Sequence, residues 1–208
     1  MTRAGKRLKL LVVGVGGQGA LTAARFLGEA ALATGMDVNV GQLHGMSQRG
    51  GSVECPVLLG PGQSSHIGRG EADVLLGLEP LEVKRALAYV SARTQVVVNL
   101  GKIVPFSLAI QGKEYPPLDN ILEQVRQVAA AVFEIDGPAL VKQTGLSRTL
   151  NVAMLGALAG LGILPFAGEA LWQAIERKIP ARFLEANRRA FELGSRVTSG
   201  NPKNVKRD

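Results

Sequence analysis

The chain has 208 residues, of which 46% are hydrophobic and only 4% aromatic, and its formal net charge is +7. This length suits one α/β domain with a sizeable core, and the hydrophobic share excludes global disorder. The few aromatic side chains exclude the base-stacking platforms that bind single-stranded nucleic acid.

The positive charge is concentrated at the two ends of the chain, which supply six of the seven net charges. The charged residues of these ends are Arg3, Lys6, Arg7 and Lys9, and then Lys203, Lys206, Arg207 and Asp208. A nucleic-acid site would place its bases on a folded face instead. We therefore expect one domain over residues 1–208 with solvated basic tails at 1–7 and 200–208, and no nucleic-acid partner.

Cys55 is the only cysteine, and the chain has two histidines, His44 and His66. This excludes an internal disulfide, a self-contained iron–sulfur cluster and structural zinc, so we predict no metal site and a reducing, cytoplasmic location. The basic N-terminus lacks the apolar run of a secretory signal. The apolar stretch 150–167 contains Asn151, Pro165 and glycines, so we expect no membrane span but a buried helix in which Gly156 and Gly160 let a neighbour approach closely.

The predicted elements begin with a buried strand at Leu8–Val13. The glycine loop Gly14–Gly19 follows, and alanines and leucines at helical spacing predict a helix that Gly35 ends. Further strands are expected at Asp37–Leu43 and Ser52–Leu59, and a turn-rich loop at Gly60–Gly70.

The second half predicts strands at Asp73–Leu78, Thr94–Leu100 and Val132–Ile135. We expect helices from Pro80 to about Val90 and over Leu118–Ala130. The intervening segment 103–117 is expected to be irregular, and from Pro138 onward the pattern is helical, with breaks at Gly145, Gly162–Pro165 and Pro180. Strands that alternate with helices predict an α/β, Rossmann-like, mostly parallel sheet flanked by helices, with a helical C-terminal layer.

The glycine loop satisfies the G-x-G-x-x-G pattern between a strand and a helix. Its predicted site residues are Gly14, Gly16, Gly17, Gln18 and Gly19. A dinucleotide site also needs an acidic residue at the end of the second strand, whereas Asp37 lies at its beginning. Three interpretations stay open: NAD(P) binding, binding of another anion such as part of coenzyme A, and a purely structural turn.

The segment 44–52 follows the carboxyl end of the second predicted strand, where open α/β sheets form their binding crevice. Its predicted site residues are Ser47, Gln48, Arg49, Gly50 and Gly51, because they combine hydrogen-bonding side chains with a flexible backbone. Arg49 is suited to grip a carboxylate or phosphate, or to tie two loops together. His44 has no acid partner nearby in the sequence, and no catalytic residue is predicted.

Together, Gly14-Val15-Gly16-Gly17-Gln18-Gly19 and His44-Gly45-Met46-Ser47-Gln48-Arg49-Gly50-Gly51-Ser52 resemble the gamma domain of pyruvate and ketoisovalerate:ferredoxin oxidoreductases. The stretch Gly70–Pro80 and its following helix resemble the stand-alone form of that domain, the beta subunit of indolepyruvate:ferredoxin oxidoreductases.

The resemblance implies a small subunit that is not active alone. A large alpha subunit would carry thiamine diphosphate, Mg²⁺ and [4Fe-4S] clusters, and this chain would hold no cofactor by itself. The complex would convert a 2-oxoacid, with an arylpyruvate favoured, and CoA into acyl-CoA and CO2, with electrons passed to ferredoxin. The glycine loop and the 47–51 segment would face that site, and the subunit would complete the complex and help to bind CoA. Two alternatives stay open: a stand-alone NAD(P)-dependent oxidoreductase and a non-catalytic nucleotide- or CoA-binding module.

Overall fold

The computed structural model describes residues 7–44, 51–62, 66–104 and 114–199. Its strands are β1 (Leu8–Val15), β2 (Val38–Val40), β3 (Leu43–His44), β4 (Ser52–Leu59), β5 (Val74–Gly77), β6 (Gln95–Asn99) and β7 (Ala131–Ile135). Its α-helices are α1 (Ala20–Ala33), α2 (Pro80–Arg85), α4 (Leu118–Val128), α5 (Gly137–Thr144), α6 (Leu150–Gly160), α7 (Gly168–Glu176) and α8 (Ala181–Thr198). Short 3₁₀ turns lie at Ala86–Tyr89 and Ser147–Thr149.

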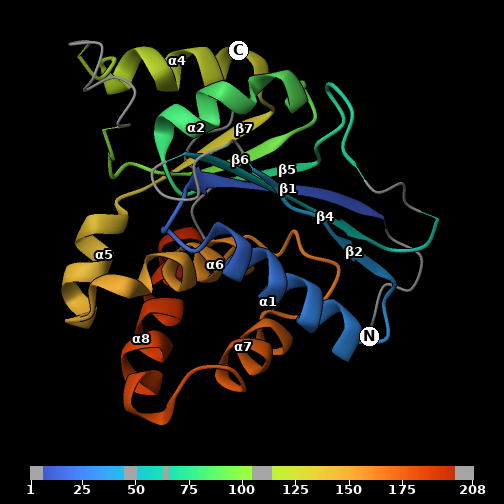
Figure 1. Ribbon diagram of the computed structural model, residues 1–208, viewed down its shortest axis with the longest axis vertical. Helices are drawn as coiled ribbons and strands as arrows, with labels where there is room; N and C mark the ends of the chain where they lie inside the picture. Colours follow the sequence, from blue (N-terminus) through green and yellow to red (C-terminus); the bar gives the residue numbers. More distant parts are fainter. Residues whose placement is uncertain (1–6, 45–50, 63–65, 105–113, 200–208) are drawn as a thin grey trace.

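The strands form one sheet in the order β2-β4-β1-β5-β6-β7, with β3 also paired to β4 (Figure 1). The pairs β1–β5, β5–β6 and β6–β7 are parallel, whereas β4 is antiparallel to β1, β2 and β3. Every described strand except β4 therefore runs in one direction. The expected mostly parallel α/β sheet is confirmed.

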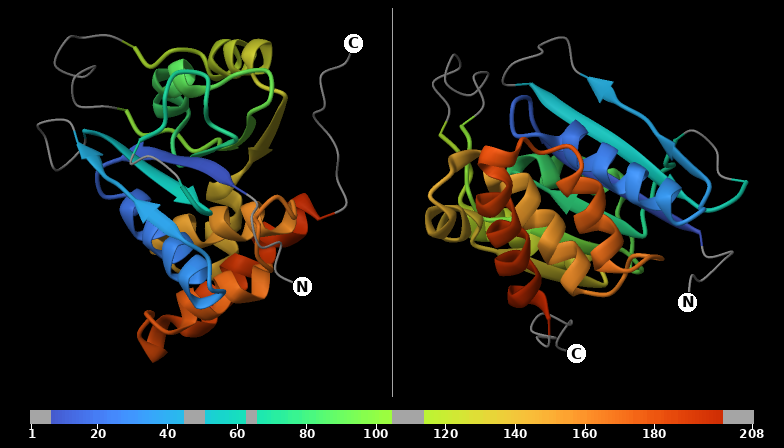
Figure 2. Two further views of the ribbon diagram at one scale, coloured as in Figure 1. Left: turned by 90° about the vertical axis from the view of Figure 1, so that its right-hand side faces the viewer. Right: turned by 90° about the horizontal axis from the view of Figure 1, so that it is seen from below.

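Helices cover both faces of the sheet. Figures 1 and 2 show α1 and the C-terminal helices on one face and α2 and α4 on the other. Alternate residues of β1 serve the two cores, because Leu10 and Val12 join the core under α1 and α6 while Leu11 and Val13 join the core under α2 and α4. The expected helical C-terminal layer is present as α5–α8.

The predicted strand Asp37–Leu43 is interrupted, and this part of the prediction was too simple. The pairings Val40↔Val57 and Leu43↔Glu54 keep one register, so Gly41 lies opposite Pro56. Gly41 N–H donates to the Pro56 carbonyl at 2.9 Å, but Pro56 has no N–H to return the bond. The ladder therefore breaks into β2 and β3.

The helix after Pro80 is also shorter than predicted, since its α-helical part ends at Arg85 and a 3₁₀ turn continues to Tyr89. The carbonyls of Ala88 and Tyr89 accept hydrogen bonds from the amides of Gly70 and Ala72, each at 3.0 Å. These bonds to the segment before β5 occupy carbonyls at the end of the turn, so the helix tightens and stops there.

Helix α6 is buried along most of its length and lies against α8. A Cβ placed on Gly156 would collide with the Phe191 backbone, and one on Gly160 with the Ser195 backbone. The prediction that these glycines admit a close neighbour is confirmed. Among the described residues, no helix combines the length and apolar character needed to cross a bilayer.

Candidate functional site

The glycine loop connects the carboxyl end of β1 to the first turn of α1. Gln18 N–H donates to the Val15 carbonyl at 3.0 Å, which closes a turn with Gly16 and Gly17 at its corners. Gly17 has φ +102°, and no atom lies within 4 Å of the position its Cβ would take. The turn therefore requires a glycine for its backbone conformation and not for internal packing.

Gly51 lies directly beside this turn. Its carbonyl accepts a hydrogen bond from Gly16 N–H at 2.8 Å, next to the pairing of Val15 with Ser52. The end of the 44–52 segment thus contacts the glycine loop. Ser47, Gln48, Arg49 and Gly50 lie outside the described residues.

A pocket of about 400 Å³ opens at the glycine loop and the first turn of α1, with Gln42 and Val53 on its other side. Gly16, Gly17 and Gly19 line it, whereas Gly14 lies within β1 against Leu78 and Gln18. Gly19 caps α1 without a side chain, and no acidic residue lies in the first helical turn. The positive end of the helix dipole and the first turn of α1 therefore lie at the pocket, an arrangement suited to an anionic group.

Gln18 uses both ends of its side-chain amide within the chain. Its Oε1 accepts from Val15 N–H at 2.7 Å, and its Nε2 donates to the Leu78 carbonyl at 2.9 Å. The same carbonyl accepts from Asn99 Nδ2 at 2.8 Å. The carboxyl ends of β1, β5 and β6 are thereby joined, so Gln18 acts on the pocket through the shape of the loop.

Asn151, in the first turn of α6, contacts the end of the glycine loop. It is largely buried, and its Nδ2 lies 3.5 Å from the Gly19 carbonyl. A Cβ on Gly19 would come within 2.7 Å of that nitrogen, so Gly19 is required both by its φ of +86° and by the approach of α6. Sequence reasoning took Asn151 only as a polar break in an apolar helix.

Sequence reasoning also missed a buried carboxyl group at this edge. Glu79 has no exposed surface, and its carboxylate accepts from Glu82 N–H at 3.0 Å, Tyr115 O–H at 2.5 Å and Ile103 N–H at 3.4 Å. Burial raises the pKa of Glu79, while these donors oppose the rise. The Glu79-Pro80 pair at a strand end is the signal that could have indicated a helix cap.

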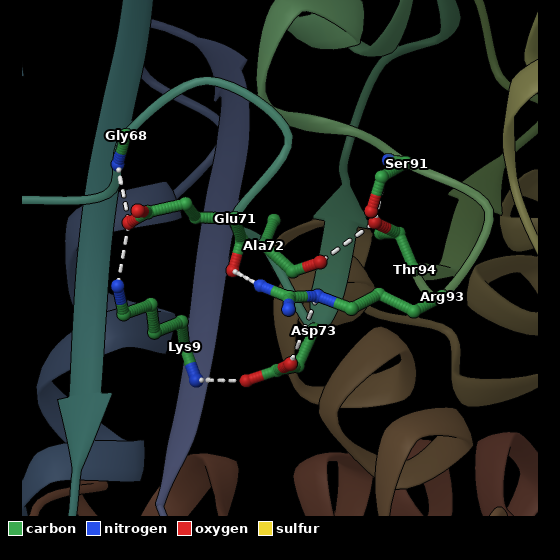
Figure 3. A network of polar contacts seen from close by, with 8 residues as sticks. All are labelled: Lys9, Gly68, Glu71, Ala72, Asp73, Ser91, Arg93 and Thr94. Atoms are coloured by element: carbon green, nitrogen blue, oxygen red, sulfur yellow. Dashed lines mark hydrogen bonds and ion pairs between the residues drawn. The ribbon is translucent and has the colours of Figure 1, made fainter.

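At the amino ends of the parallel strands, opposite the glycine loop, lies a polar network of a different kind (Figure 3). Lys9 Nζ contacts Glu71 Oε2 at 2.5 Å, and Arg93 Nε lies 3.7 Å from Asp73 Oδ1. Thr94 O–H donates to the Ala72 carbonyl at 2.6 Å and its oxygen accepts from Ser91 N–H at 2.9 Å. These groups hold the loops before β5 and β6, so their partners are internal.

The geometry is unfavourable for a dinucleotide. Asp37 precedes β2, and its carbonyl binds Gly60 N–H at the edge of the sheet away from the glycine loop. In addition, β4 lies between β1 and β2, whereas the dinucleotide fold places its second strand beside the first. In the part of the chain that the structure describes, no three metal-ligating side chains gather.

Comparisons with known proteins agree with this architecture. The structure matches the gamma subunit of a keto/oxoacid ferredoxin oxidoreductase from Geobacter sulfurreducens with a TM-score of 0.67, at 22% identity over 93% of this chain and 99% of that one. It also matches a 2-oxoglutarate:ferredoxin oxidoreductase from Magnetococcus marinus with a TM-score of 0.71, at 21% identity over 97% of this chain and 33% of that one. At these identities the matches establish the fold.

The sequence comparisons reach further. The chain is 36% identical to the indolepyruvate oxidoreductase subunit IorB of Archaeoglobus fulgidus, over 96% of this chain and 100% of that protein. Residues 9–197 match the family described as pyruvate ferredoxin/flavodoxin oxidoreductase. The resemblance indicated by the glycine loop, the 44–52 segment and the Gly70–Pro80 stretch is confirmed. The chain belongs to the pyruvate ferredoxin/flavodoxin oxidoreductase family.

Proposed function

We propose that this chain is the small subunit of a 2-oxoacid:ferredoxin oxidoreductase, with an arylpyruvate such as indolepyruvate as the substrate. The observation that carries the proposal is the 36% identity to subunit IorB, over 96% of this chain and 100% of that protein. The reaction joins a 2-oxoacid and CoA to give acyl-CoA and CO2, while electrons pass to ferredoxin. The choice of substrate and of electron acceptor in this proposal is based on the names of the relatives.

The larger subunit holds the redox cofactors in this proposal. Thiamine diphosphate with Mg²⁺ and [4Fe-4S] clusters would supply decarboxylation and electron transfer there. Cys55 is buried in β4, and burial raises the pKa of its thiol to about 11. It is protonated at neutral pH, and as the single cysteine it cannot supply the ligand set of a cluster.

This chain would contribute the glycine-loop pocket. A phosphate group of CoA fits the uncapped amides at the start of α1, and the pocket of about 400 Å³ has room for one section of that molecule. Gln18 and Asn99 hold the loop in shape through the Leu78 carbonyl. The chain would thus orient CoA and close the edge of the catalytic site, while the chemistry takes place on the partner's cofactors.

The test is to isolate the complex from the source organism through an affinity tag on this chain. We expect a larger subunit with stoichiometric thiamine diphosphate and iron, and CoA-dependent reduction of ferredoxin or viologen with arylpyruvates. The chain alone should be colourless and show no turnover. NAD(P)H-dependent turnover by the isolated chain, or its purification without a larger subunit, would contradict the proposal.

A further inference from the structure

Leu78 is the residue at which the glycine loop meets the end of β5. Its N–H donates to the Val13 carbonyl at 2.8 Å, and its carbonyl accepts from Gln18 Nε2 at 2.9 Å. A Cβ on Gly14 would lie 3.1 Å from Leu78 Cβ, so the two residues are in close contact. The position of Leu78 therefore determines where the glycine loop begins and how its Gln18 side chain is held.

Asn99, the last residue of β6, is a second donor to the same carbonyl. Asn99 is 1% exposed, and its Nδ2 lies 2.8 Å from the Leu78 carbonyl oxygen. Its Oδ1 accepts from Gly101 N–H at 3.1 Å. A carbonyl oxygen has two lone pairs, so the donors from Gln18 and Asn99 occupy both of them. Together these donors fix the direction in which the Leu78 carbonyl points.

The amide of Asn99 is itself enclosed by two glycines. A Cβ on Gly137, the first residue of α5, would collide with Asn99 Oδ1, and a Cβ on Gly101 would lie 3.0 Å from Asn99 Nδ2. The residues of β6 that precede Asn99 are three valines and Gln95. A polar group buried in such a strand is unfavourable unless it forms hydrogen bonds. The backbone around Asn99 is thus shaped to keep this amide in one orientation.

We propose that Asn99 is a positioning residue for CoA, which acts on the glycine-loop pocket through the Leu78 carbonyl and Gln18. The inference rests on the proposed function, in which a phosphate of CoA lies in that pocket. Asn99 is not among the described residues that line the pocket. Gln18 transmits its effect, because Gln18 Oε1 accepts from Val15 N–H at 2.7 Å, where the turn with Gly17 begins. Loss of Asn99 leaves the carbonyl free to tilt, so the loop spends less time in the shape that receives CoA.

The expected result is a lower apparent affinity for CoA without a change in the chemistry. In the complex reconstituted with the larger subunit, Asn99→Ala should raise KM for CoA about fivefold or more and leave kcat within about twofold. Asn187→Ala is the matched control, because Asn187 is also buried and its Nδ2 donates to the Phe183 carbonyl at 2.8 Å within α8. Both variants should lower the melting temperature, but Asn187→Ala should keep the wild-type KM.

Gln18→Met tests the route between Asn99 and the pocket, because it removes both hydrogen bonds of the Gln18 side chain at nearly constant length. It should also raise KM for CoA. In the Gln18→Met/Asn99→Ala double variant, the increase should be smaller than the product of the two single increases, since both act through one carbonyl. Asn99→Ser is the second variant if Asn99→Ala does not fold. Its hydroxyl keeps a polar group at the position but is one bond too short to reach the Leu78 carbonyl.

A wild-type KM for CoA in folded Asn99→Ala or Asn99→Ser would overturn the inference. Equal increases in Asn99→Ala and Asn187→Ala would also overturn it, and so would increases in Asn99→Ala and Gln18→Met that multiply in full. The proposed function fails differently, because the wild-type complex would then show no CoA-dependent reduction of ferredoxin or viologen.

Discussion

Gly17 and Gly35 share a backbone conformation that other residues rarely adopt, with φ of +102° and +76°. Neither has an atom of the chain within 4 Å of its absent Cβ. They differ in location, because Gly17 lines the pocket and Gly35 follows the C-terminal end of α1. The pair therefore separates the effect of backbone strain from an effect on a ligand.

We expect Gly17→Ala and Gly35→Ala each to lower the free energy of unfolding by about 1–2 kcal/mol, because both force a side chain into a left-handed conformation. In the reconstituted complex, Gly17→Ala should also lower kcat/KM for CoA by about tenfold, and Gly35→Ala should not. Steady-state kinetics at varied CoA concentration would measure this. Equal kinetic effects would mean that the loop has only a structural role.

Tyr115→Phe should destabilise the chain more at pH 8 than at pH 4.5. The folded-state pKa of Glu79 is raised by burial, so the contribution of this group to stability is full below its unfolded pKa and declines as the pH rises through the folded value. The Tyr115 hydroxyl limits that decline by stabilising the carboxylate. Without the hydroxyl, the pKa of Glu79 rises further and the loss of stability toward high pH becomes larger.

Urea unfolding of both proteins between pH 4.5 and 8 would measure the difference, which we expect to reach about 1–2 kcal/mol at the upper end. Among the described residues, Lys102 lies over the Tyr115 ring and the Glu82–Arg85 ion pair lies in α2, and these charges are present in both proteins. A difference that is constant with pH would show that Tyr115 does not stabilise an ionised Glu79.

At the residue scale, the sequence predicted the glycine loop but not the groups that support it. A strand, a glycine pattern and a helix follow one another along the chain, so local rules reveal the loop. The bonds of Leu78 to Gln18 and Asn99 span 60 and 21 residues, and that of Glu79 to Tyr115 spans 36. Such contacts depend on strand order, which local patterns do not contain.

At the element scale, α6 and α8 approach so closely that three glycines are needed between them. Absent side chains on Gly156, Gly160 and Gly194 leave space for the backbone of the facing helix. Thr198 O–H donates to the Ala157 carbonyl at 2.8 Å across the same contact. The sequence predicted the two glycines of α6 as an approach site but did not identify which helix approaches.

Gly156→Ala should destabilise the protein by about 2 kcal/mol or more, although alanine usually favours a helix over glycine by about 1 kcal/mol. The reason is that the new methyl group would collide with the Phe191 backbone. Thermal and urea unfolding would measure the loss. Gly168→Ala is the control, because its methyl group would lie 3.2 Å from Ala159 Cβ, where a small shift suffices, and its effect should be much smaller.

At the scale of the whole molecule, the layers could be predicted and the strand order could not. Buried aliphatic runs bounded by glycine or proline indicate β1, β4, β5 and β6, and the breaks at Gly145 and Pro180 mark helix ends. The sequence contains no local pattern that indicates the position of β4 between β1 and β2. An antiparallel strand that is buried on both sides has the same composition as a parallel one.

The placement of β4 also affects the order in which the protein folds during synthesis. In a simple strand-helix-strand unit, the first 40 residues would contain every strand that supports the turn after β1. Here β1 pairs with β4 from Leu8↔Leu59 to Val15↔Ser52, and Gly16 is bound by Gly51. The pocket therefore cannot form until the ribosome has released the chain beyond residue 59. A local β2–β4 hairpin can form first and then dock beside β1, a non-local step of the kind that slows folding.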